Sequence, residues 1–135
     1  MNLVDRIVTQ FRISDFSKDT SGVTWFTTGN VDLRELAIFM TESGARFVTI
    51  TATELPQNQG ICFEYLWDFE GRLLGFAFYP SGKTMPSIYD SCEAADWIER
   101  EIHEEFAVDF TGRVHEPLLL REGDRPGVNL QEVAK

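Results

Sequence analysis

The stretch SIYDSCEAADWIEREIHEEFAVDFTGRVHEPLLLRE, residues 87–122, carries the strongest structural signals in the chain. Asp90, with Glu93 three residues later, has the pattern of a helix N-cap and capping box. The apolar residues that recur at helical spacing are Ala94, Trp97, Ile98, Ile102 and Phe106. We therefore predict an amphipathic helix that buries this row, followed by an extended segment at 108–110 that ends at Gly112.

The rest of the chain predicts an α+β fold. The predicted elements are a helix at 2–12 (or a strand at 7–13), a loop at 14–22, a strand at 23–28, a helix capped by Asp32 and stopped at Gly44, strands at 46–54, 61–69 and 72–79, a loop at 80–86 and a short edge strand at 87–89. In the strand at 46–54, Val48, Ile50 and Ala52 alternate with threonines, so we expect them on one face. Turns between consecutive strands predict a largely antiparallel sheet with the helices packed on one face.

The composition is that of a folded, acidic protein. Its 135 residues suit a single domain over 1–135, with a core at about 23–122 and an extended C-terminal tail at 123–135. A net charge of −10 argues against a nucleic-acid partner, because phosphate binding needs clustered Lys and Arg. The apolar runs are shorter than the roughly 20 residues of a membrane-spanning helix. Two cysteines without a secretion signal predict reduced thiols in the cytosol.

The order of residues within 87–122 resembles the signature of the 30-kilodalton-subunit family of respiratory complex I, the NADH-quinone oxidoreductase. Matching subunits occur in energy-converting nickel–iron hydrogenases and formate hydrogenlyase. The matching positions are Trp97, Glu99, Arg100, Glu101, Phe106, Phe110 and Gly112, followed by Leu118, Leu119 and Leu120. Three departures favour the hydrogenase branch: Ala107 replaces the usual glycine, Arg113-Val114 replaces His-Pro, and the Pro-Leu-Arg-Lys ending of complex I members is missing. The resemblance implies the same α+β fold.

The tripeptide Glu99-Arg100-Glu101 is a hallmark of the family that the chain resembles. We interpret its role as structural, with at least one side chain turned toward the sheet. There, an arginine–carboxylate pair would hold backbone groups. A solvated helix face and a contact with a partner protein are the two alternatives.

No residue pattern predicts a catalytic, cofactor or metal site. His103-Glu104 lacks the second histidine of the zinc-protease helix, because position 107 is alanine. Cys62, Cys92, His103 and His115 do not have metal-ligand spacing. An iron–sulfur cluster takes four cysteine ligands, and this chain has two cysteines. Many acids surround Cys92 in the sequence, so we predict a packed thiol there rather than an activated one.

The run Leu118, Leu119 and Leu120 is predicted to bind another subunit, and folding back onto the core is the alternative. The chain is then a non-catalytic accessory subunit without a cofactor of its own. The resemblance implies its partner, a hydrogenase large subunit or a 49-kilodalton-like subunit of complex I. It also implies a cytoplasmic position, peripheral to the inner face of the cell membrane. Two other hypotheses are a free-standing binding or regulatory module and a small enzyme using the carboxylates of the helix at 93–106.

Overall fold

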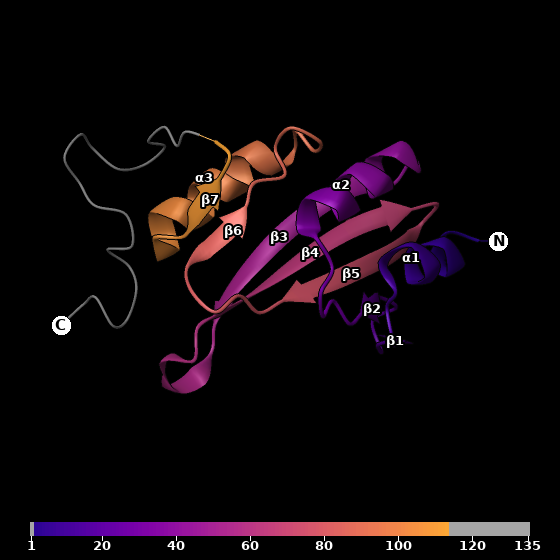
Figure 1. The fold of residues 1–135 in the computed structure, drawn as a ribbon, viewed down its shortest axis with the longest axis horizontal. Helices are drawn as coiled ribbons and strands as arrows, with labels where there is room; N and C mark the ends of the chain where they lie inside the picture. The colour runs from indigo at the N-terminus through magenta and orange to yellow at the C-terminus, as the bar shows by residue number, and fades with distance from the viewer. Residues whose placement is uncertain (1, 114–135) are drawn as a thin grey trace.

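The computed structural model describes residues 2–113, which form a sheet with helices packed against it (Figure 1). The helices are α1 (Leu3–Phe11), α2 (Leu33–Glu42) and α3 (Ala95–Phe106). The predicted α+β class is therefore confirmed. His115, Leu118, Leu119, Leu120 and the tail at 123–135 lie outside the described residues.

The main sheet has five strands in the order β1-β2-β5-β4-β3. These strands are β1 (Phe16–Lys18), β2 (Thr24–Phe26), β3 (Arg46–Glu54), β4 (Ile61–Phe69) and β5 (Arg72–Phe78). Three of the four pairings are antiparallel, and β2 runs parallel to β5. The short helical turn η1 (Pro56–Asn58) lies between β3 and β4. The predicted largely antiparallel sheet is confirmed within residues 2–113.

The turns and helix starts follow from local sequence. Asp32 caps α2 as predicted, since its Oδ1 accepts a hydrogen bond of 3.1 Å from the amide of Glu35. Glu70 and Gly71 connect β4 to β5 with φ angles of 53° and 85°. Two positive φ angles are the geometry of a tight hairpin turn, which confirms the predicted hairpin.

The three helices cover one face of the sheet and share one core with it. Ile7 of α1, Leu36 of α2 and Ile102 of α3 are buried in the same cluster as Phe63 and Trp67 of β4. The α2 helix lies between the other two in Figure 1. Phe11 and Phe39 join α1 to α2, and Thr41 donates a hydrogen bond of 3.1 Å to the carbonyl of Ser91 ahead of α3.

A second, smaller sheet holds α3 in place. It consists of β6 (Thr84–Pro86) and β7 (Asp109–Thr111), which pair in parallel on the two sides of α3 in the sequence. The edge strand predicted at 87–89 is therefore wrong, because the strand lies three residues earlier. The loop predicted at 14–22 is also wrong in part, because it contains β1. Three-residue strands are too short to show an alternating pattern, and every residue of β1 is exposed.

The start and orientation of α3 differ from the prediction. Asp90 does not cap the helix, which begins at Ala95 after a series of turns and has no side-chain cap. Ala94 is exposed, and Trp97 is 58% exposed, so both are wrongly placed in the buried row. Glu99 occupies the inward face instead. Ile102 is buried as predicted, and Ile98 and Phe106 pack partly against the core.

A second correction concerns β3. The register of its pairing with β4 shifts between Phe47 and Thr49. Such a bulge displaces the side chains on one side of it from the regular alternation. Val48 is therefore 40% exposed, whereas Ile50 is buried and Phe47 packs on the ring of Trp67.

Candidate functional site

The charged cluster at the junction of α3 and β7 is built around Glu99. This carboxylate is fully buried. It accepts hydrogen bonds from the hydroxyl of Ser87 at 2.7 Å and from the backbone amide of Ile88 at 2.8 Å. A buried carboxylate is costly unless it is paired and hydrogen-bonded, and these two donors hold the segment after β6 against α3.

Arg113 supplies the positive charge for this cluster. Its Nη1 lies 3.0 Å from Oε1 of Glu99, and its Nη2 donates to Oδ1 of Asp96. The guanidinium also lies over the ring of Tyr89, with its carbon 5.0 Å from the ring centroid. The Arg113 side chain is only 7% exposed, so this residue fastens the end of β7 to the middle of α3.

The other two residues of the tripeptide point outward. Arg100 pairs with Asp96 one helical turn away, at 3.1 Å. Glu101 is exposed, and no hydrogen bond or ion pair to it is found among residues 2–113. The hydrogen bond from Arg113, and then the charges of Arg113 and Arg100, hold the pKa of Asp96 below its usual range. The carboxylates of Glu99 and Asp96 therefore each face charged or hydrogen-bonding donors.

The last two residues of the signature shape the exit from β7. Phe110 is fully buried and packs edge-on against Phe63 of β4, with ring centroids 6.4 Å apart. Gly112 has a φ of 91°, and a side chain at this position would collide with the guanidinium of Arg34. That guanidinium donates a hydrogen bond of 3.1 Å to the carbonyl of Thr111. The φ angle is the stronger reason for glycine at position 112, because the guanidinium at the end of the flexible Arg34 side chain could shift away.

The cysteines and His103 lie in separate surroundings. Cys92 is buried and lies 3.6 Å from the hydroxyl of Thr41, and burial raises the pKa of its thiol. These contacts agree with a packed thiol. The Nδ1 of His103 forms a hydrogen bond of 2.8 Å with the carbonyl of Val108. This bond links the end of α3 to the residue before β7. Among residues 2–113, no three His, Cys, Asp or Glu side chains gather as a metal site would require.

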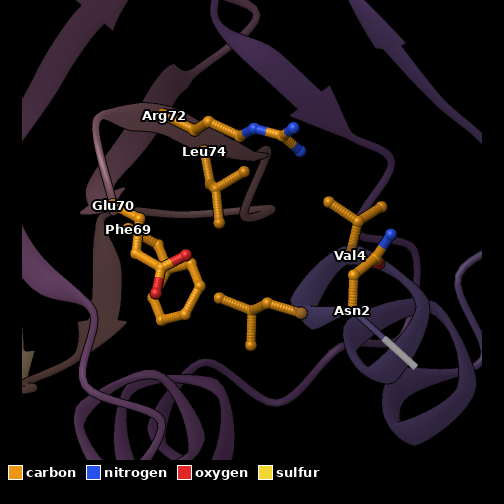
Figure 2. Close-up of a pocket in the computed structure, with 7 residues that line it drawn as sticks. Asn2, Val4, Phe69, Glu70, Arg72 and Leu74 are labelled. Carbon is orange, nitrogen blue, oxygen red and sulfur yellow. The ribbon is translucent and has the colours of Figure 1, made fainter.

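The hollow between α1 and the β4–β5 turn has a volume of about 340 Å³. Figure 2 shows Arg72 extending across it and Asn2 and Val4 on the α1 side. Leu3, Phe69, Glu70 and Leu74 complete its lining. Among residues 2–113, the lining of this hollow includes no Ser, Cys, Thr or His.

Comparison with known proteins identifies the family. Residues 26–131 match the model of the 30-kilodalton subunit of respiratory-chain NADH dehydrogenase. The chain belongs to this family. The resemblance seen in residues 87–122 is thus confirmed at the level of the 30-kilodalton-subunit family. Comparison with curated proteins gives no significant match.

Two solved structures share the fold of this 30-kilodalton-subunit domain. One is a chain from the membrane-bound sulfane sulfur reductase, an archaeal respiratory membrane complex, with a TM-score of 0.73 and 21% identity over 93% of this chain and 78% of that one. The other is the trypsin-resistant fragment 1–134 of Nqo5, with a TM-score of 0.65 and 17% identity over 85% of this chain and 98% of that one. No helix within residues 2–113 has the length and apolar character needed to cross a bilayer.

Sequence reasoning did not predict the contacts that Ser87 and Arg113 make with Glu99 in the charged cluster. Ser87 lies twelve residues before Glu99, and Arg113 lies fourteen residues after it. Neither spacing is a helical or strand period, so no local pattern joins these residues to Glu99. Arg113 stood out in the sequence as a departure from the family pattern, and the structure shows what its side chain contacts.

Proposed function

We propose that this chain is a non-catalytic accessory subunit of a complex I-like oxidoreductase that works at a membrane. The observation that carries the proposal is the family match over residues 26–131. The charged cluster supports it, because Glu99 and its donors Ser87, Ile88 and Arg113 join α3 to the segments that follow both strands of the small sheet. Such a block would present a fixed surface to a partner protein.

The partner that we propose is the large subunit of a nickel–iron hydrogenase or the 49-kilodalton-like subunit of a complex I relative. The departures at Ala107 and Arg113 support the hydrogenase branch. One of the two structural relatives is itself part of a membrane-bound respiratory complex. By analogy, this chain would lie at the cytoplasmic face of the membrane and be held there through its complex.

Affinity purification from native membranes tests the proposal. The tagged full-length chain is expected to retain a large subunit of the hydrogenase or 49-kilodalton type, identified by mass spectrometry, in a fixed ratio. A permanent interface of this kind buries at least about 1,000 Å² and survives washing. Recovery of the chain as a free monomer, with neither class of large subunit bound, would contradict it.

The leucine run at 118–120 offers a sharper version of this experiment. If Leu118 contacts the partner, Leu118→Asp lowers the recovery of the large subunit more than it lowers the melting temperature of the isolated chain. Leu130→Asp is the matched control, because it places the same charge on another leucine of the C-terminal region. A large loss of thermal stability with unchanged recovery would mean that the run folds back onto the core.

A further inference from the structure

The outer face of α3 carries an exposed tryptophan beside carboxylates. Trp97 is 58% exposed, and Glu101 and Glu105 follow it at intervals of four residues, both exposed. Side chains four residues apart are neighbours on a helix surface. We call Trp97, Glu101 and Glu105 the outer row of α3. Figure 1 shows α3 at the end of the helical layer away from α1.

Within residues 2–113, no hydrogen bond or ion pair engages a side chain of the outer row. Trp97 is the second most exposed of the large apolar side chains in the described chain, after Tyr79. The cation nearest in sequence, Arg100, is already paired with Asp96. An exposed tryptophan is costly to leave in water and is a residue type that dominates the energetics of protein interfaces.

The acidic character of the outer row favours a positively charged partner. The α3 helix contains five acids and one arginine, in a chain whose net charge is −10. Phosphate groups are repelled by such a surface, and an acidic protein is repelled as well. A guanidinium group fits best, because it stacks on the face of an indole ring and binds a carboxylate through two hydrogen bonds.

The same combination occurs inside this molecule. Arg113 lies over the ring of Tyr89 at 5.0 Å while it pairs with Glu99 and Asp96. On the other side of α3, an aromatic ring and two carboxylates therefore already bind one arginine together. Trp97 and Glu101 present these two components on the outer face without an arginine from the described chain.

We infer that the outer row of α3 is a docking surface for a basic segment of the partner protein, with an arginine stacked on Trp97 and paired with Glu101. This inference rests on the proposed function, because it names the surface through which the accessory subunit binds. It is independent of the leucine run at 118–120.

The test uses the tagged full-length chain in its native complex. Trp97→Ala and Glu101→Lys are each expected to reduce recovery of the large subunit about ten-fold or more, as truncation of an interface hot spot does. Recovery of the wild-type complex should also fall as salt rises, because salt screens the charges at the edge of such an interface. Ile38→Ala and Glu42→Lys are matched controls, since both residues are exposed on α2.

The outcomes separate the inference from the proposed function. A wild-type chain that retains no large subunit overturns both. A wild-type chain that retains it equally well with Trp97→Ala and Glu101→Lys overturns the docking surface alone. If Trp97→Ala lowers recovery of the large subunit, Glu101→Lys does not, and recovery does not depend on salt, then the docked segment is apolar and not basic. A photo-crosslinker at position 101 that captures an arginine-bearing peptide of the large subunit supports the inference directly.

Discussion

The carboxylate of Glu99 and the guanidinium of Arg113 lie 3.0 Å apart, although fourteen residues separate them in the chain. The pair is nearly sealed from water, with Glu99 fully buried and the Arg113 side chain 7% exposed. Glu99 also accepts from Ser87 and Ile88, so one carboxylate connects three segments. The strength of this connection is the first property to measure.

Glu99→Ala should destabilise the domain by about 3–5 kcal/mol, the cost of breaking a buried ion pair from one side. The substitution leaves the amide of Ile88 without its acceptor and removes one of the two carboxylates that Arg113 binds. The free energy of unfolding in urea is the measurement. Glu101→Ala is the control on the same helix and should change stability by less than about 0.5 kcal/mol, because Glu101 is exposed. Equal losses in the two variants would show that the cluster does not stabilise the fold.

Ala107→Gly should stabilise the domain by about 1 kcal/mol. Ala107 ends α3 with a φ of 58° and a ψ of 32°, the left-handed conformation that disfavours a side chain. Glycine adopts this conformation without strain. The relief of strain outweighs the larger conformational entropy that glycine loses on folding. Ala37→Gly, within α2, is the opposite control and should be destabilising. A lower melting temperature for Ala107→Gly would contradict the strained helix end.

Gly75→Ala should destabilise the sheet by about 1–3 kcal/mol, the usual cost of forcing extra atoms into a packed site. Trp25 of β2 lies opposite Gly75 of β5, and a Cβ there would stand 2.5 Å from the indole ring. The ring cannot move away freely, because its Nε1 donates a hydrogen bond of 2.8 Å to Asp19. Thermal unfolding of the variant measures the effect, and an unchanged melting temperature would mean that the indole shifts without cost.

The contribution of Asp19 should depend on pH. Hydrogen bonds from Trp25 and Ser21 lower the pKa of this carboxyl from 3.8 to about 2. A folded-state pKa below the unfolded one stabilises the fold above pH about 4, and this contribution disappears as pH falls toward 2. The melting temperatures of wild type and Asp19→Asn should therefore differ at pH 6 and converge near pH 2. Glu101→Ala is the control, because Glu101 is exposed and makes no contact with Asp19 or Trp25, and its melting temperature should differ little from that of the wild type at both pH values.

The local sequence determined the elements whose signals lie within a few residues. Alternating apolar residues predicted the bounds of β3 and β4. The capping pattern of Asp32, with Glu35 three residues later, predicted the start of α2. The signature in residues 87–122 indicated the family from residue order alone. These features depend on periodicity, capping and residue order, which are properties of the chain itself.

Only the tertiary structure decided which face of α3 is buried. The helical spacing of apolar residues assigns Trp97 to the core, but burial of Glu99 among Ser87, Ile88 and Arg113 turns the tryptophan to the outside. The parallel pairing of β6 with β7 and the bulge at Val48 likewise depend on contacts between distant residues. The physical reason is that the energy of a buried charge depends on the donors that meet it in space, and no local pattern records them.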